Sequence, residues 1–475
     1  MVMGEFTVEA QVLVVGGGPG GYAAAFRAAD LGLDVTIVDA GGRLGGVCLF
    51  RGCIPSKTLL HVAEIMDDAR RAEEMGVDFG KPTVDLDRLR AWKNAVTEKL
   101  AGGLLELCKR RGIQLIKGRA TFESPDTARL SGADVARIRF KHAIIASGST
   151  PRPLPDLSFR QGGRIMNSTG ALALADVPGR LLVVGGGYVG VEIGSIYAAL
   201  GSRVTLVEGS SRLLAGADAD LVRPLQSRLS EIFETIHFKT GIRTMSEGDN
   251  AVEVVLDGEE SGAPMQFDRV LVAVGRSPGS EGLGLENTRV EVDGRGFIRI
   301  DGQCRTAQPN IFAVGDIVGG AMLAHKAMYE GKVAAEVIAG KPSAFDVQAI
   351  PAVVYTNPQL AWCGLTEEEA RKQGRRVKVT RFSWSASGRA VSMGVGARGL
   401  TKIVGDAESG RLLGMGIVGR EAGEMISEGV LAIEMGALAE DVALTMHPHP
   451  TLSESEEEAA EAFLGTATHI MPATF

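Results

Sequence analysis

Two stretches of this sequence repeat each other without a gap, 169 residues apart. Residues 12–39 read VLVVGGGPGGYAAAFRAADLGLDVTIVD, and residues 181–208 read LLVVGGGYVGVEIGSIYAALGSRVTLVE. Each stretch begins with a β-branched apolar run, passes through a glycine turn into a segment with few helix breakers, and ends in a second β-branched run and an acid. This order predicts two βαβ units of the kind that bind dinucleotides.

The glycines of each repeat stand where a bound pyrophosphate needs bare backbone. The first allows a tight turn, the second lets the backbone approach the pyrophosphate at a helix N-terminus, and the third lets helix and strand pack closely. A lone GxGxxG could be incidental, but here an acid follows each third glycine by 18 residues, where it can accept hydrogen bonds from ribose hydroxyls. The alternative role for either acid is a turn residue. These predicted positions are Gly16, Gly18, Gly21 and Asp39 in the first repeat, and Gly185, Gly187, Gly190 and Glu208 in the second.

A close cysteine pair follows the first repeat, in GGVCLFRGCIPSK (45–57). The chain has only 5 cysteines, too few for a disulfide scaffold, so a close pair favours catalysis. In a regular helix the Cα atoms of residues five apart lie roughly 8–9 Å apart, beyond the roughly 7 Å that a disulfide tolerates. A bridge between Cys48 and Cys53 therefore requires an irregular turn, which Gly52 permits. Pro55 fits the first turn of a following helix, which places Cys53 where thiolate is favoured. Half of a zinc site and two inert thiols are the alternatives.

Composition bounds the compartment and the partners. The N-terminus lacks a basic region followed by an apolar run, and no stretch reaches about 18 uncharged apolar residues. A net charge of -8 leaves no basic stripe for nucleic acid. We therefore expect a cytoplasmic protein with no membrane anchor, no nucleic-acid ligand and no metal site.

Further motifs accompany the repeats: KHAIIASGS (141–149), RVLVAVGRSP (269–278), IFAVGDIVGG (311–320), MLAHKAMYEG (322–331) and HPHPTLSE (447–454). With these motifs the chain resembles the pyridine nucleotide-disulfide oxidoreductases nearly end to end. The resemblance implies an α/β fold with two Rossmann-like dinucleotide-binding domains, a central domain and a C-terminal α+β dimerisation domain. The implied boundaries are 1–150 for the FAD-binding domain with its redox-active disulfide, 151–273 for the NAD-binding domain, 274–346 for the central domain that completes the FAD site, and 347–475 for the dimerisation domain.

The resemblance also assigns roles to single residues. Cys48 is the interchange thiol that meets the substrate, and Cys53 lies against the flavin. His449, rather than its neighbour His447, is the base, and Glu454 orients its imidazole. Histidine ordinarily titrates near neutrality and so suits proton removal from a thiol.

Other assigned residues serve the two cofactors. Lys57 is paired with Glu192 beside the reactive flavin nitrogen; a solvated helix lysine and an acid that complements a helix dipole in its first turn are the alternatives. Tyr188 is expected over the nicotinamide pocket, with simple packing as its alternative. The remaining FAD contacts are Gly46, Ser147, Gly148, Asp316 at the ribityl hydroxyls, Met322, Leu323, Ala324 and His325, and Gly275 joins the NAD site.

The implied reaction oxidises protein-bound dihydrolipoyl groups to lipoyl disulfides and reduces NAD to NADH. The implied assembly is a homodimer that serves a lipoyl-carrying protein of a 2-oxoacid dehydrogenase or related complex. Glu208 repels a 2′-phosphate, so NAD is expected over NADP. Phe50 and Arg51 depart from the family pattern close to the cysteines and are expected to affect substrate entry. A related FAD-dependent reductase of another small disulfide, and a redox-silent flavoprotein scaffold, remain as alternatives.

Overall fold

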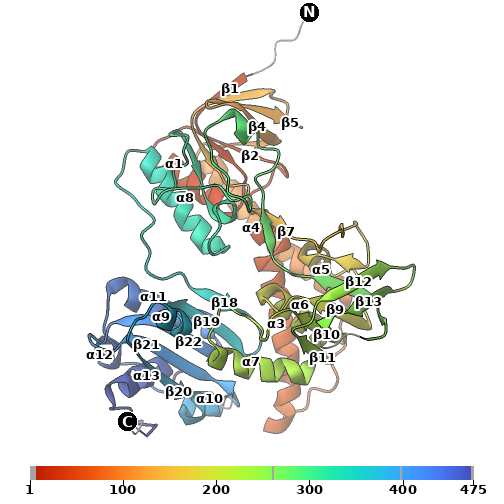
Figure 1. Ribbon diagram of the computed structural model, residues 1–475, viewed down its shortest axis with the longest axis vertical. Coiled ribbons are helices and arrows are strands. Elements are labelled where there is room, and N and C mark those ends of the chain that lie inside the picture. Colours follow the sequence, from red (N-terminus) through yellow and green to blue (C-terminus); the bar gives the residue numbers. More distant parts are fainter. Residues whose placement is uncertain (1–6, 259–261, 396–397, 472–475) are drawn as a thin grey trace, which may run out of the picture. The chain divides into compact units, whose positions relative to one another are not determined.

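The structure, a computed structural model, describes residues 7–258, 262–395 and 398–471, and its chain divides into two compact units (Figure 1). The first unit comprises residues 1–58, 85–152 and 275–346, and the second comprises residues 59–84, 153–274 and 347–475. Each unit is therefore assembled from three separate segments of the chain. One boundary falls inside a single helix, α3 (Cys53–Arg71).

The first unit is built on a seven-stranded sheet with the order β3-β2-β1-β6-β5-β4, in which β17 also pairs with β6. β1 pairs in parallel with both β2 and β6, and α1 connects β1 to β2, so the first predicted βαβ unit is confirmed. A separate two-stranded sheet joins β7 to β16. The strands are β1 (Thr7–Val15), β2 (Val35–Asp39), β3 (Gln114–Lys117), β4 (Arg119–Ser124), β5 (Thr127–Ser131), β6 (Arg137–Ile145), β7 (Ser149–Pro151), β16 (Arg276–Pro278) and β17 (Ile311–Ala313).

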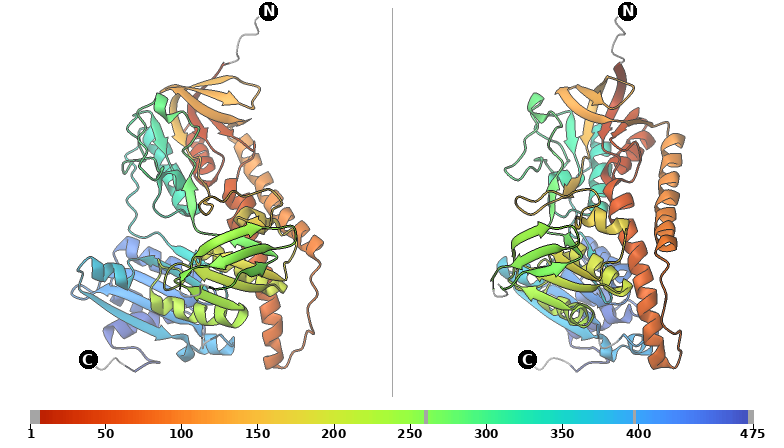
Figure 2. Two further views of the ribbon diagram at one scale, coloured as in Figure 1. Left: turned by 45° about the vertical axis from the view of Figure 1, so that its right-hand side comes forward. Right: turned by 90° about the vertical axis from the view of Figure 1, so that its right-hand side faces the viewer.

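The two faces of this sheet bury different side chains because successive residues of a strand point to opposite faces. Val12 and Val14 face a core shared with α1 and α8, which lie side by side in both sets of views (Figures 1 and 2). Leu13 and Val15 face a second core that includes Phe122 of β4. The helices of this unit are α1 (Pro19–Asp30), α2 (Gly46–Arg51), α4 (Leu86–Arg110), η3 (Leu285–Asn287), η4 (Gly315–Val318) and α8 (Ala324–Ile338).

The second unit contains a five-stranded parallel sheet with the order β11-β10-β9-β15-β8. α6 connects β9 to β10, which confirms the second predicted βαβ unit. An antiparallel sheet of β12, β13 and β14 closes one apolar core of this half. The elements are β8 (Ile165–Met166), α5 (Ser168–Ala173), β9 (Arg180–Val184), α6 (Tyr188–Leu200), β10 (Arg203–Glu208), α7 (Ala219–Ile232), β11 (Thr235–Phe238), β12 (Ile242–Glu247), β13 (Val252–Leu256), β14 (Met265–Phe267) and β15 (Arg269–Val272), with η1 (Ala72–Met75) after α3.

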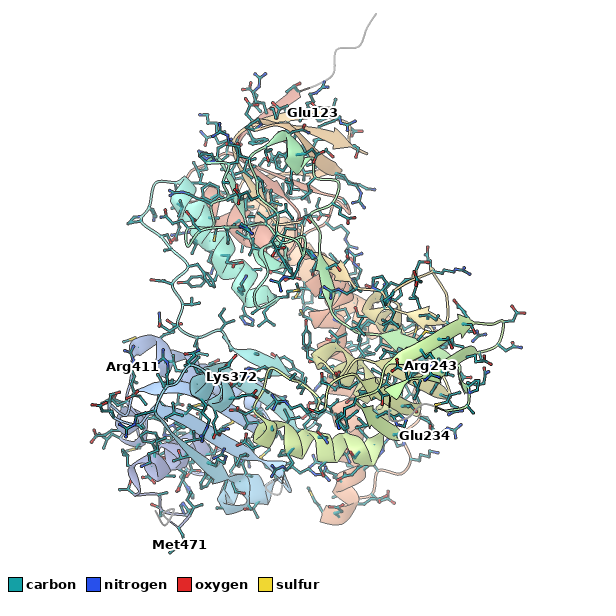
Figure 3. All side chains as sticks on the ribbon, in the orientation of Figure 1. Glu123, Glu234, Arg243, Lys372, Arg411 and Met471 are labelled. Carbon is teal, nitrogen blue, oxygen red and sulfur yellow. The ribbon has the colours of Figure 1, made fainter. Side chains whose placement is uncertain are left out.

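The second unit also holds a five-stranded antiparallel sheet with the order β18-β19-β22-β21-β20. Its core packs against α11 and α13, and α7 contacts it where Leu221 meets the backbone of Gly416. The exposed residues Arg243 and Lys372 of this unit are labelled in Figure 3. The elements are β18 (Ala352–Val354), β19 (Gln359–Gly364), α9 (Glu367–Lys372), β20 (Val377–Ser383), η5 (Trp384–Ala386), α10 (Gly388–Ser392), β21 (Leu400–Asp406), β22 (Leu412–Gly419), α11 (Ala422–Met435), α12 (Ala439–Ala443) and α13 (Glu454–Leu464).

These sheets confirm the predicted α/β class, with two parallel sheets that each begin in a βαβ repeat and an antiparallel sheet with helices at the C-terminal end. Across the described part of the chain, no helix combines the length and the apolar character that crossing a membrane requires.

Candidate active site

The cysteine pair sits at a break between two helices. Cys48 lies in α2, and Cys53 is the first residue of α3. Gly52 separates them with φ -147° and ψ -111°, outside the helical region, so the predicted irregular turn is confirmed. Pro55 falls in the first turn of α3, where a missing N–H costs nothing. Cys53 therefore stands at the positive end of a 19-residue helix dipole.

Both cysteines are thiols in this structure and interact directly. A hydrogen bond with Cys53, together with burial, raises the pKa of Cys48 well above its ordinary value, while the charge of Lys57 opposes this shift. Cys48 therefore gives up its proton less readily than an ordinary thiol. Burial, followed by the charges of the two cysteines, also raises the pKa of Tyr22. Tyr22 is a neighbour of the pair that sequence reasoning missed, because no motif marks it.

Phe50 and Arg51 follow Cys48 in α2. The guanidinium of Arg43 lies 4.3 Å from the centre of the Phe50 ring, close enough for a cation–π contact. Arg43 also forms an ion pair with Glu98 of α4. Phe50 is thereby held by neighbours in its own unit, whereas Arg51 is exposed.

The first glycine loop has no space for side chains. Gly16 has φ +107°, and a Cβ there would lie 2.4 Å from the carbonyl oxygen of Ala146. A Cβ on Gly21 would lie 1.8 Å from the carbonyl oxygen of Gly16. Gly18 caps α1. A Cβ added there would have only the Cα of Gly46 near it, at 4.0 Å, so the backbone of Gly18 is open to a ligand. This cradle at a helix N-terminus suits the pyrophosphate of FAD.

The second glycine loop reproduces the first in detail. A Cβ on Gly185 would lie 2.5 Å from the carbonyl oxygen of Ala273, and one on Gly190 would lie 2.0 Å from that of Gly185. Gly187 caps α6 and has no atom within 4 Å of its Cβ direction among the described residues. Tyr188, the first residue of α6, is exposed. The loop therefore suits the second dinucleotide, NAD.

The acid at the end of each repeat accepts a hydrogen bond from the glycine loop of the same repeat. Asp39 accepts hydrogen bonds from the N–H of Gly17 at 2.9 Å and of Gly41 at 2.8 Å. Glu208 accepts them from Gly186 at 2.7 Å and from the N–H of Ser210 at 2.6 Å. An ionised carboxylate has about four acceptor positions, so both acids retain capacity for ribose hydroxyls.

The remaining predicted FAD contacts lie in the first unit. Asp316 of η4 accepts a hydrogen bond from Ser149, and the Nε atom of Arg276 lies 3.8 Å from its carboxylate. The hydroxyl oxygen of Ser147 is buried without a hydrogen-bond partner among the described residues, as expected for a group that meets a ligand. Met322 and Leu323 precede α8, which begins at Ala324 and includes His325.

Sequence reasoning missed a buried ion pair within α8. Lys326 and Glu330 of α8 lie 2.6 Å apart, and Glu330 also accepts the N–H of Gly315 at 2.8 Å. Burial raises the pKa of Glu330, which Lys326 partly offsets. The i,i+4 spacing in MLAHKAMYEG was the available signal.

Lys57 belongs to the first unit and Glu192 to the second, so their pairing remains a prediction. Glu192 is buried in α6 and accepts the N–H of Tyr355 at 3.0 Å. It lies beyond the first turn of α6, so the first-turn dipole alternative does not account for it. Gly275, with φ +114°, belongs to the first unit, so its part in the NAD site likewise remains a prediction.

His449 and Glu454 form a dyad before and at the start of α13. The Nδ1 atom of His449 lies 2.7 Å from Glu454 Oε1, and the other carboxylate oxygen accepts the N–H of Thr451 at 2.7 Å. Burial alone would raise the pKa of Glu454, but the Thr451 N–H and His449 lower it, so the acid stays ionised. Nδ1–H therefore donates to the carboxylate, which leaves Nε2 able to accept a proton. The His449 side chain is 77% exposed, whereas His447 is 4% exposed.

Two models of one protein family match this chain. Residues 10–331 match the family described as pyridine nucleotide-disulphide oxidoreductase, and residues 350–460 match the dimerisation domain of that family. A dihydrolipoyl dehydrogenase of Vibrio cholerae is 46% identical over 98% of this chain and 97% of its own length. One from Geobacillus stearothermophilus is 45% identical over 99% of this chain and 100% of its own length.

Solved structures show the same fold. LpdA of Mycobacterium tuberculosis superposes with a TM-score of 0.87 at 25% identity, covering 96% of this chain and 99% of that one. The HOCl-induced flavoprotein disulfide reductase RclA of Escherichia coli gives a TM-score of 0.84 at 28% identity, covering 95% and 99%.

Proposed function

Because the chain belongs to the pyridine nucleotide-disulphide oxidoreductase family, we propose that it is a dihydrolipoyl dehydrogenase that uses FAD and NAD. It oxidises dihydrolipoyl groups to lipoyl disulfides and reduces NAD to NADH. The observation that carries this proposal is the thiol pair at the break between α2 and α3, beside a glycine cradle for FAD in the same unit.

The chain's own residues account for the thiol chemistry. Nε2 of His449 accepts a proton from one dihydrolipoyl thiol, and Glu454 stabilises the imidazolium that forms. The substrate thiolate attacks the sulfur of Cys48 in the oxidised pair, which forms a mixed disulfide and releases Cys53 as thiolate. The second substrate thiol then closes the lipoyl disulfide and releases Cys48. The first glycine loop, Ser147 and Asp316 would hold FAD, which would supply the two-electron chemistry that links the cysteine pair to NAD.

Several finer assignments belong to this proposal. The dimerisation domain supports a homodimer, and the reaction calls for a lipoyl-carrying protein of a 2-oxoacid dehydrogenase or related complex as partner. The four domains are proposed at 1–150, 151–273, 274–346 and 347–475. The few, scattered cysteines support a cytoplasmic location.

A coupled assay tests the activity. The purified protein is expected to be yellow and to reduce NAD with dihydrolipoamide. NADP is expected to be about 100-fold less efficient, because Glu208 beside a 2′-phosphate costs about 2–3 kcal/mol. Flavin binding with turnover of another small disulfide, and none of lipoamide, would indicate the related reductase. Flavin binding without any disulfide turnover would indicate the redox-silent scaffold.

A further inference from the structure

A second cluster of titratable side chains lies in the C-terminal antiparallel domain, apart from the His449–Glu454 pair. Among the described residues, Glu428 of α11, His447 and Glu456 of α13 form the one group of three potential metal ligands, with ligand atoms all within 4.8 Å of one another. No metal site is predictable there from the sequence, because these residues are spread over α11, a loop and α13.

Glu456 is the most unusual member of this cluster. It is fully buried, and neither carboxyl oxygen has a hydrogen-bond partner among the described residues. A buried carboxylate without donors is costly unless a cation or a proton compensates it. Burial and the charge of Glu428 raise the pKa of Glu456 to about 9, so in the absence of a cation a proton takes this place.

His447 is oriented as a ligand. Its Nδ1 atom lies 2.8 Å from the carbonyl oxygen of Thr445, and a carbonyl can only accept, so Nδ1 carries the hydrogen. This contact fixes the ring and leaves the Nε2 lone pair available for a metal, as in most metal-binding histidines. Nε2 points at Glu428, whose Oε1 lies 2.9 Å away. Without a metal, Nε2 must instead be protonated to make that contact.

We propose that Glu428, His447 and Glu456 form a zinc site, in which one imidazole nitrogen and two carboxylates bind Zn²⁺. Imidazole nitrogen and carboxylate oxygen both bind zinc, and three protein ligands leave a fourth position for water. In a tetrahedral site with bonds of about 2.0–2.2 Å, ligand atoms lie roughly 3.4 Å apart, so the widest pair must close by up to roughly 1.4 Å. Nε2 of His447 and Oε1 of Glu428, now 2.9 Å apart, must separate by roughly 0.5 Å. Two carboxylates compensate the charge of the ion, and the Glu428 side chain, 33% exposed, leads from the site to solvent.

Zinc binding to the oxidised holoenzyme tests this site. The disulfide must be intact, or both Cys48 and Cys53 replaced by Ser, because thiolates bind zinc themselves. Equilibrium dialysis against buffered Zn²⁺ with elemental analysis should give one zinc per chain. Binding should release protons from His447 and Glu456, which a pH indicator can count.

Matched variants locate the ion. Glu456→Gln keeps the shape of the side chain but removes an anionic ligand, and should weaken zinc binding at least 100-fold, beyond the 10–100-fold typical of outer-shell changes. His447→Gln should do the same. Glu458→Gln is the control. Glu458 lies on α13 like Glu456 and pairs with His469, but it is outside the cluster. The zinc affinity of Glu458→Gln should stay within about twofold of the parent.

Two results would overturn the proposal. The first is that the wild type binds no zinc in the dialysis, which would leave Glu456 compensated by a proton instead. The second is that Glu456→Gln binds zinc as tightly as the wild type, which would place the ion elsewhere. If Glu456→Gln does not fold, as judged by flavin content and circular dichroism, Glu428→Gln provides the same test from a partly exposed position. Lipoamide turnover is not the readout, so failure here leaves the proposed activity untouched.

Discussion

Two chemically identical thiols receive different roles from their positions at the α2–α3 break. Cys53 lies at the start of α3, and a hydrogen bond with Cys53, together with burial, raises the pKa of Cys48. We expect Cys48→Ser to leave Cys53 as a thiolate beside oxidised flavin, which gives a long-wavelength charge-transfer absorption and no lipoamide turnover. Cys53→Ser is the matched variant and should lose turnover without gaining the band. Absorption spectra of the two variants decide this, and a band in Cys53→Ser instead would reverse the two roles.

At the scale of elements, two glycines of the β9–α6 turn serve different roles: Gly190 is required for packing, and Gly187 is proposed to admit the dinucleotide. A Cβ on Gly190 would lie 2.0 Å from the carbonyl oxygen of Gly185, whereas one on Gly187 would meet no described atom within 4 Å. Gly187→Ala should therefore fold with full flavin content but raise the KM for NAD at least about tenfold, because it fills the approach to the pyrophosphate. Gly190→Ala should lower the thermal midpoint as well. Unchanged NAD kinetics in Gly187→Ala would contradict this assignment of the second loop.

A buried lysine connects three elements of the C-terminal half. Lys402 of β21 lies 2.9 Å from Asp218, 3.0 Å from Asp220 of α7 and 2.8 Å from Glu367 of α9. Lys402→Met removes the shared cation and leaves these carboxylates uncompensated, which should cost about 3–5 kcal/mol at neutral pH. Lys372→Met, at an exposed ion pair with Glu368, is the control and should cost below about 1 kcal/mol.

The loss in Lys402→Met should depend on pH with a defined sign. Burial alone would raise the pKa values of Asp220 and Glu367, but Arg381 and Lys402 lower them below their ordinary values. Stability from these carboxylates is thus present above about pH 4.5 and disappears as the pH falls through their lowered pKa values. The difference between wild type and Lys402→Met should shrink below pH 4. Urea unfolding followed by tryptophan fluorescence measures this, since Trp362 and Trp384 lie in or beside this sheet. An undiminished difference at low pH would assign the loss to packing.

How far the sequence could predict these features depends on the separation of the residues involved. The βαβ units and the helix break at Gly52 arise from neighbouring residues, so spacing alone predicted them. Lys402 gives no such signal, because LTKIVGD is also consistent with a strand whose lysine faces water. The buried Glu456 and the contacts of Ser149 with Asp316 likewise depend on segments that meet only after folding.

At the scale of the whole molecule, the residues of the proposed reaction are divided between the two units. The first holds Cys48, Cys53 and the FAD cradle, and the second holds the NAD loop, His449 and Glu454. The dimerisation domain contains His449 and Glu454, about 400 positions along the chain from Cys48. The family resemblance implies that this domain completes the partner's site, so we predict that one chain supplies the cysteines and the other supplies the base.

Hybrid dimers test this division between chains. Cys53→Ser and His449→Gln homodimers each lack one essential group in both sites. In a hybrid dimer one site carries both defects, while the other combines an intact Cys48–Cys53 pair with an intact His449. Random pairing of equal amounts makes about half of all dimers hybrid with one working site each, so about a quarter of wild-type lipoamide turnover should return. Hybrids isolated by two different tags should reach about half of wild-type turnover, because one of their two sites is intact. If isolated hybrids are no more active than either mutant homodimer, His449 acts on the cysteines of its own chain, and a site shared between two chains would have to be abandoned.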